Sequence, residues 1–266
     1  MRALLICTLL ACTMLLFAAP ARAQDWAKQA LEKSPRHQEW VTLKHDGRAV
    51  QAFIVYPEVK EKAAAVVVIH EIFGLTDWAR DLADQLAAAG YIAIAPDLLS
   101  GYGPGGGGSS AFASTQDAGK AISGLDSDVV NADLDAAADY VKKLPAANGK
   151  VAVAGFCWGG SKSFLYATHR HDLSAAFVFY GTAPEKLDTI TAPVYGFYAG
   201  NDARVGATLP ATIEGMKKAG KKYDPVTYEG AGHGFMRAGE DPAGTEGNKK
   251  AREEAWKRWL ELLKSM

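Results

Sequence analysis

Short apolar runs alternate with amphipathic stretches along most of the chain. The runs are rich in β-branched residues and predict strands, and the stretches between them predict helices. A continuous run such as Val66–Ile69 suits a strand that is buried on both faces of a helix-covered parallel sheet. The expected strands are 37–43, 49–56, 65–69, 91–95, 151–154, 175–180, 194–199 and 223–228. The expected helices are 78–89, 128–144, 161–168, 209–219 and 247–263.

This alternation predicts a single α/β domain with a mostly parallel eight-stranded sheet and helices on both faces. The first two strands have no helix between them, so we expect them to form an antiparallel edge. The chain contains no internal repeat and no stretch with the composition of an interdomain linker. Residues 24–266 are therefore expected to form one domain.

One segment, Gly101–Ser110, has low complexity and reads GYGPGGGGSS. Its glycines favour a flexible surface loop. The segment also leaves the carboxyl end of a predicted parallel strand, where α/β sheets bind ligands. A mobile flap over an active site is the second interpretation.

The first 23 residues have the features of a secretory signal. Arg2 gives a short positive start, and the apolar run Ala3–Ala19 contains no charge. The run is shorter than the roughly 20 residues that span a membrane, although an uncleaved anchor is the alternative. Ala21-Arg22-Ala23 fits the small-x-small cleavage pattern. We expect cleavage after Ala23 and export to the periplasm or the medium.

Cleavage would change the cysteine inventory. Cys7 and Cys12 would leave with the signal, so Cys157 would be the single thiol of the mature chain. An internal disulfide is then impossible, and this thiol needs another explanation.

Composition excludes several classes of protein. With 48% hydrophobic residues the chain is not expected to be disordered. Lys and Arg number 29 against 30 Asp and Glu, which leaves no excess of positive charge for nucleic acid. No second apolar stretch is long enough to span a membrane, so we expect a mature protein that is soluble and monomeric.

Chemistry is indicated most clearly between the strand 151–154 and the helix 161–168. The connecting sequence is Gly155-Phe156-Cys157-Trp158-Gly159-Gly160, a nucleophile-elbow pattern with cysteine in the usual place of serine. Such a turn is too tight for side chains beside the nucleophile and projects the sulfur at a helix amino end, whose free N–H groups favour negative charge. The alternative is a buried, inert cysteine at a glycine-rich turn.

A thiol nucleophile needs a base, and the base needs an orienting acid. His233 lies in a glycine-rich loop directly after the last predicted strand, and Asp202 ends the strand before it. The order Cys157, Asp202, His233 matches the nucleophile–acid–histidine order of α/β hydrolases. The other candidates are less well placed, because they follow a helix or lie at the opposite sheet edge: His169, His171, Asp188 and Asp224.

Backbone N–H groups of Ile72 and Trp158 are the candidate oxyanion donors, because one follows the strand 65–69 and the other follows the nucleophile. Glu71 would then lie near the sulfur. The alternative for Glu71 is a strand-end carboxylate that faces solvent or pairs with a cation. His70, Glu71 and the later histidines lack metal-ligand spacing, so no metal is expected.

Taken together, these residues resemble the dienelactone hydrolase family (carboxymethylenebutenolidases) of the α/β-hydrolase fold. The matching pieces run in family order over roughly residues 37–265, and they are His70-Glu71-Ile72-Phe73-Gly74, Pro96-Asp97-Leu98, Gly155-Phe156-Cys157-Trp158-Gly159-Gly160, Gly200-Asn201-Asp202 and Gly232-His233-Gly234-Phe235.

The resemblance implies a Cys-Asp-His triad and neither cofactor nor metal. It implies that Glu71 holds the thiol at rest and releases it when substrate arrives. Arg237 corresponds to one of two arginines that bind the carboxylate of the family's substrate, while Ser100-Gly101-Tyr102 stands where the second is expected. A single arginine binds a carboxylate less firmly than a pair. Phe73 and Tyr102 are further candidates for substrate binding.

We therefore expect hydrolysis of carboxylic esters or lactones, including dienelactone-type enol lactones, through an acyl-thioenzyme. A thioesterase or a peptidase could use the same three residues, since fold and triad do not fix the acyl group. Two other classes are a thiol redox protein, which would lack a resolving cysteine, and a non-catalytic binder on the same scaffold.

Overall fold

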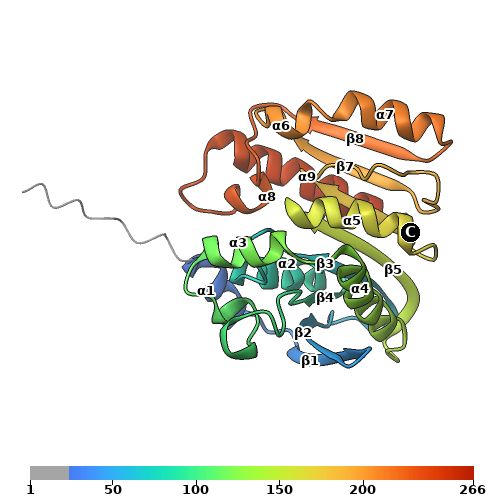
Figure 1. Ribbon diagram of the computed structural model, residues 1–266. Coiled ribbons are helices and arrows are strands. Elements are labelled where there is room, and N and C mark those ends of the chain that lie inside the picture. The colour runs from blue at the N-terminus through green and yellow to red at the C-terminus, as the bar shows by residue number, and fades with distance from the viewer. Residues whose placement is uncertain (1–23) are drawn as a thin grey trace, which may run out of the picture.

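An eight-stranded sheet organises residues 24–266, which are the residues that the computed structural model describes (Figure 1). The strands are β1 (Gln38–His45), β2 (Arg48–Val55), β3 (Ala63–Ile69), β4 (Ile92–Pro96), β5 (Ala147–Phe156), β6 (Ala175–Phe179), β7 (Val194–Ala199) and β8 (Tyr223–Tyr228). The helices are α1 (Asp25–Lys33), α2 (Asp77–Ala88), α3 (Thr115–Ser123), α4 (Ser127–Lys142), α5 (Trp158–His169), α6 (Ala203–Gly206), α7 (Leu209–Lys218), α8 (Phe235–Ala238) and α9 (Glu246–Lys264), with 3-10 turns η1 (Pro104–Gly106) and η2 (Ser109–Ala111). The predicted signal, residues 1–23, lies outside the described residues.

The strand order is β1-β2-β4-β3-β5-β6-β7-β8. β1 pairs antiparallel with β2, and β2 with β4, whereas β3 to β8 all pair in parallel. The turn between β1 and β2 consists of Asp46 and Gly47, both with positive φ, which is the backbone of a tight hairpin. All eight predicted strands and the antiparallel edge are confirmed.

Helices cover both faces of the sheet, as predicted. On one face α2 and α9 pack through fully buried Trp78 and Trp259 against a cluster that includes Phe156 at the end of β5. On the other face α4, α5 and α7 cover a second apolar cluster. Phe156 stacks on Phe179 with ring centroids 4.5 Å apart, so aromatic packing stabilises the carboxyl ends of β5 and β6.

Several elements escaped the sequence prediction. α1 and α3 were not expected, because both are short and α3 contains Gly119 in its interior. Ser114 starts α3 by accepting a hydrogen bond from the N–H of Asp117. α5 begins at Trp158 rather than at Ser161, so the glycine pair belongs to its first turn.

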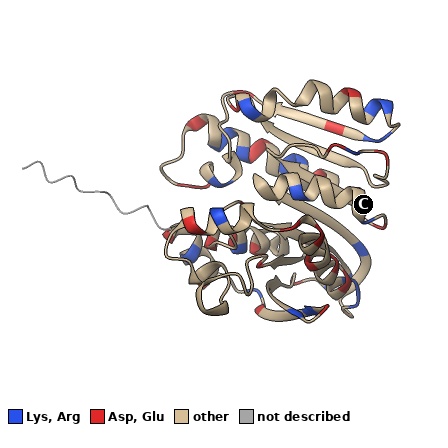
Figure 2. Cartoon of the chain, in the orientation of Figure 1, with Lys and Arg blue, Asp and Glu red and all other residues tan. Residues whose placement is uncertain are grey.

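In the view of Figure 2, Lys and Arg positions are intermixed with Asp and Glu positions along the ribbon. In the described part of the chain no helix combines the length and the apolar character needed to cross a membrane.

Candidate active site

Cys157 occupies a strained turn between β5 and α5. Its φ of 56° and ψ of −116° lie outside the regions that L-residues usually adopt. The turn is held because the N–H of Cys157 donates to the carbonyl of Phe179 at 3.0 Å, and its carbonyl accepts from the N–H of Ser161 at 3.2 Å. The strain is therefore imposed by the neighbouring strand and by the helix, as a nucleophile elbow requires.

Glycines around this turn allow the close approach of backbone segments. A Cβ on Gly155 would collide with the backbone of Gly159, and a Cβ on Gly159 would collide with the carbonyls of Ile69 and His70. A Cβ on Gly160 would collide with the carbonyl of Phe179. The steric reason that the sequence suggested for the glycines applies, and it extends to the second glycine of the pair.

The loops that follow β7 and β8 bring an acid and an imidazole together. Asp202, 8% exposed, accepts a hydrogen bond from His233, with 2.5 Å between Nδ1 and Oδ2. The other carboxylate oxygen of Asp202 caps α6 by accepting from the N–H of Val205 at 3.2 Å. An ionised carboxylate at Oδ2 requires the proton on Nδ1, which leaves Nε2 of His233 free to accept a proton.

The Cys157 thiol also affects the imidazole of His233. The Cys157 side chain is the largest influence raising the pKa of His233 above its ordinary value, and Asp202 adds to the shift, while burial opposes it. One third of the His233 side chain, 33%, is exposed. The structure thus brings Asp202 and His233 into contact from loops that are 31 positions apart in the sequence. That Cys157 acts with them as a triad stays a prediction.

Two backbone donors at the ends of neighbouring strands lack an acceptor in the described part of the chain. The N–H groups of Ile72 and Trp158 donate to no protein acceptor within residues 24–266. Trp158 is the first residue of α5, so its N–H has no partner inside the helix. Their role as oxyanion donors stays a prediction.

Glu71 is buried and bound by Arg237. The exposed fraction of Glu71 is 3%, and its Oε2 accepts from Nε of Arg237 at 2.6 Å. Burial raises the pKa of Glu71 above its ordinary value, although the arginine opposes this shift. The cation-paired alternative for Glu71 is therefore the observed one, and no hydrogen bond of the described chain joins Glu71 to Cys157. Its role in holding the thiol stays a prediction.

Tyr180 is a site residue that sequence reasoning missed. It follows β6 with a positive φ of 41°, and its ring packs edge-on against His233 at 5.0 Å. Its buried hydroxyl has no hydrogen-bond partner in the described part of the protein. Burial and then the charge of Glu71 raise the pKa of Tyr180 well above its ordinary value. A single tyrosine at a strand end gives no sequence signal of this position.

The remaining predicted binding residues are placed differently. Phe73 is partly buried, and the guanidinium of Arg237 lies 5.3 Å from its ring centroid, next to the Glu71 pair. Tyr102 is 45% exposed and packs instead on Arg48, whose guanidinium lies 4.6 Å from the ring. Arg48 comes from β2 and donates to the carbonyl of Ser100, but Asp133 binds its charge. Substrate binding by Phe73 and Tyr102 stays a prediction.

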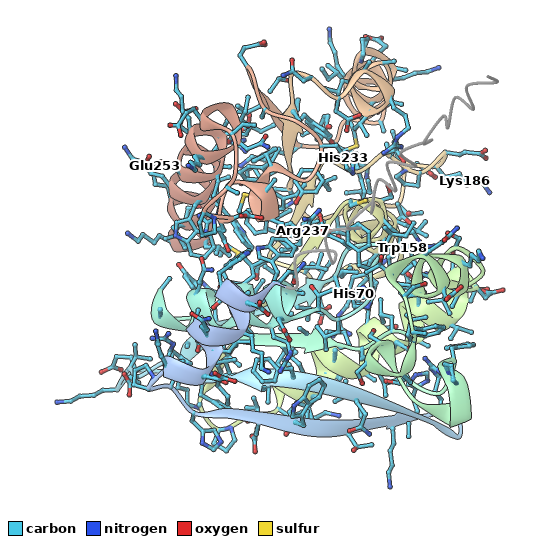
Figure 3. The ribbon with its side chains drawn as sticks, turned by 90° about the vertical axis from the view of Figure 1, so that its left-hand side faces the viewer. His70, Trp158, Lys186, His233, Arg237 and Glu253 are labelled. Atoms are coloured by element: carbon cyan, nitrogen blue, oxygen red, sulfur yellow. The ribbon has the colours of Figure 1, made fainter. Side chains whose placement is uncertain are left out.

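Figure 3 views the carboxyl ends of the parallel strands and labels His70, Trp158, His233 and Arg237, which come from four different segments. The rings of His70 and Trp158 stack with centroids 6.0 Å apart. Over residues 24–266 no group of three or more His, Cys, Asp or Glu side chains is arranged to hold a metal ion.

Comparison with known proteins identifies the family of this chain. The sequence profile of the dienelactone hydrolase family matches residues 50–266, which include Cys157, Asp202 and His233. The chain belongs to the dienelactone hydrolase family. Membership makes it a hydrolase of the lactone or ester type.

Relatives of the dienelactone hydrolase family agree over most of the chain. A protein of Salmonella typhi named "Putative carboxymethylenebutenolidase" is 32% identical over 238 residues, or 83% of this chain and 84% of the relative. The "Carboxymethylenebutenolidase" of Pseudomonas putida is 30% identical over 203 residues, 73% of this chain and 83% of the relative. The crystal structure of a "Putative Dienelactone Hydrolase" from Klebsiella pneumoniae superposes with a TM-score of 0.76 at 26% identity, covering 87% of this chain and 99% of that one.

Proposed function

We propose that this hydrolase cleaves carboxylic esters or lactones with Cys157 as the nucleophile, through an acyl-thioenzyme. The observations that carry the proposal are the contact of His233 with the Asp202 carboxylate through Nδ1 and the influence of the Cys157 side chain, which raises the pKa of His233. A base that is oriented by an acid and directed at a nucleophile is the arrangement that acyl transfer requires.

In the acylation step Sγ of Cys157 forms a bond to the acyl carbon, and its proton passes to Nε2 of His233. The carbonyl oxygen becomes an oxyanion next to the free N–H groups of Ile72 and Trp158. The bond from the acyl carbon to the ring or ester oxygen then breaks, and that oxygen takes the proton from His233. In a lactone the leaving oxygen stays attached to the acyl group, so the ring opens.

In the deacylation step Nε2 of His233 takes a proton from water, whose oxygen attacks the thioester carbon. The same two N–H groups receive the second oxyanion. Collapse of this intermediate breaks the carbon–sulfur bond and releases the carboxylic acid, and the sulfur takes the proton back from Nε2 of His233. Enol lactones suit this chemistry, because an enolate leaves more easily than an alkoxide.

The ion pair of Arg237 and Glu71 points to a substrate that carries its own carboxylate. Arg237 is 30% exposed in its side chain while Glu71 is 4% exposed, so an incoming anion meets the arginine first. Binding of that anion to Arg237 would weaken its hold on Glu71, close to the sulfur. Dienelactone-type enol lactones have the required carboxylate.

Substitution of Arg237 by alanine is expected to lower kcat/KM about tenfold for carboxylated enol lactones relative to neutral esters, because one charge-assisted contact is lost. A hydrolysis panel of neutral esters, neutral lactones, carboxylated enol lactones, thioesters and peptides measures this ratio. The double variant Arg237→Ala/Glu71→Gln removes the buried carboxylate that the single change leaves without a cation.

Arg204→Ala is the matched control. Arg204 is exposed on α6, and its substitution removes the same positive charge at another position. An unchanged ratio in both Arg237 variants would refute the role of Arg237. A panel in which thioesters or peptides exceed every ester and lactone would replace the proposed substrate class.

We further propose that the chain is exported and that residues 24–266 form the mature, monomeric enzyme. The charged start, the apolar run and the Ala21-Arg22-Ala23 site support this proposal. Fractionation of expressing bacteria, followed by amino-terminal sequencing and size-exclusion chromatography, tests it. We expect a periplasmic monomer that begins at Gln24, and recovery of the uncleaved chain from the cytoplasm would contradict export.

A further inference from the structure

The segment that carries the proposed oxyanion donor Ile72 is held by a serine from the glycine-rich loop. Leu75, three residues after Ile72, donates its N–H to Oγ of Ser109 at 2.8 Å. Ser109 begins η2, at the end of the low-complexity segment Gly101–Ser110. A loop residue is therefore bonded directly to the turn that follows β3.

Ser109 is in turn fixed to the carboxylate of Asp97, which is 6% exposed and follows β4. Oγ of Ser109 donates to Oδ1 of Asp97 at 2.5 Å, and its N–H donates to Oδ2 at 2.8 Å. Oδ1 also accepts from the N–H of Leu99 at 3.1 Å. Both oxygens of a buried acid are thus engaged, which orients the serine hydroxyl as a donor to Asp97 and an acceptor from Leu75.

Two glycines make this contact possible. A Cβ on Gly74 would lie 2.8 Å from Cβ of Ser109 and closer still to its Oγ. A Cβ on Gly108 would lie 3.1 Å from Cγ of Asp97 and would overlap one of its oxygens. Glycine at these two positions therefore allows three backbone segments to approach one another. This steric requirement is a different reason for glycine than loop flexibility.

The same turn is anchored from its other side by His70. Nδ1 of His70 lies 2.9 Å from the carbonyl oxygen of Glu71, and the N–H of Leu98 donates to Nε2 at 3.4 Å. His70 precedes Ile72 by two residues, whereas Leu75 follows it by three. Ile72 therefore lies between two anchors that both lead to the segment Asp97–Leu98.

From this geometry we infer that Ser109 is a positioning residue, which braces the Ile72–Leu75 turn against Asp97 and so holds the Ile72 N–H toward the oxyanion. On this inference the glycine-rich loop supports the site through Ser109. The inference rests on the proposed function, since Ile72 matters only if an oxyanion forms beside it. Hydrogen-bond donors assist a developing charge only when they are held in place beforehand.

Ser109→Ala tests this inference in the full mature enzyme with p-nitrophenyl acetate as substrate. Loss of the brace lets the turn shift, so we expect kcat to fall about tenfold with KM within about twofold of the original value. The inhibition constant of a phenyl trifluoromethyl ketone, whose adduct with Sγ places an oxyanion at the same donors, should rise by a similar factor. The initial release of p-nitrophenolate counts active sites, because only folded enzyme is acylated, so a loss of folded protein is not read as a loss of kcat.

Ser110→Ala is the control, because it removes a hydroxyl from the neighbouring position. Ser110 is exposed, and its side chain makes no hydrogen bond within residues 24–266. It should keep kcat and the inhibition constant. An unchanged kcat per active site in Ser109→Ala, or a fall in kcat without any change in ketone inhibition, would overturn the positioning role. Cys157→Ala run alongside separates the two proposals, because retention of activity there would refute the thiol mechanism itself.

Discussion

Alanine in place of Cys157 is expected to reduce ester and lactone hydrolysis by roughly 10⁴-fold or more, because the reaction loses its nucleophile. The protein should remain folded. Alanine keeps the Cβ that the strained turn already accommodates at φ 56°, and the hydrogen bonds of the turn involve only backbone atoms of residue 157. Steady-state hydrolysis of p-nitrophenyl acetate and a carboxylated enol lactone, with thermal unfolding measured in parallel, tests both parts.

Cys157→Ser serves as the second variant, since it keeps a nucleophilic atom in the same position with a hydroxyl in place of a thiol. It should retain a small part of the activity and should lose sensitivity to iodoacetamide. Mass spectrometry after mixing the original enzyme with substrate should detect an acyl group on the peptide that contains Cys157. If Cys157→Ala retains most of the hydrolysis, the nucleophile lies elsewhere and the proposed mechanism is wrong.

Fold prediction succeeded where one local pattern determined the element. The run Val66–Ile69 is buried on both faces because β3 lies in the middle of the sheet, and its residues show this directly. The antiparallel edge followed from the short link between β1 and β2. Helix α3 was not predicted, because it is stabilised by Ser114 at its start and by burial of Ala118 and Ile122, and a short polar stretch does not indicate this burial.

The catalytic candidates could be predicted because the parallel sheet turns chain order into position. Cys157, Asp202 and His233 each follow a strand, and the carboxyl ends of parallel strands meet at one rim. Tyr180 also follows a strand, but nothing in its neighbours distinguishes it from a core aromatic. Its closeness to His233 becomes visible only when β6 and β8 are folded into the same sheet.

Contacts between individual side chains were harder to predict from the sequence than the places of those residues in the fold. Glu71 was considered for its position after β3 and Arg237 for the family resemblance, and neither reason predicted that they bind each other across 166 positions of the chain. Likewise no sequence motif marks Ser109, because its proposed function depends on the approach of Gly74 and Asp97 in space. Such pairings depend on tertiary packing, which no local pattern contains.

Asparagine in place of Asp202 should reduce kcat on the order of 10³-fold while the structure persists. The amide can present its nitrogen to Nδ1 of His233, which favours the tautomer with the proton on Nε2 and leaves no acceptor for the thiol proton. Since Asp202 helps to raise the pKa of His233, loss of its charge should also lower that pKa. The imidazolium would then persist only to a lower pH. The measurements are kcat as a function of pH and NMR titration of His233.

Asn201→Ala is the matched control, because Asn201 is the exposed neighbour of Asp202 and its side chain makes no hydrogen bond in the described part of the chain. It should leave kcat and the His233 titration unchanged. Folding of Asp202→Asn is protected by the retained carbonyl oxygen, which can still accept from Val205 and cap α6. A variant that keeps near-normal kcat, or one in which the pKa of His233 rises, would show that Asp202 serves the loop alone and that another group orients the base.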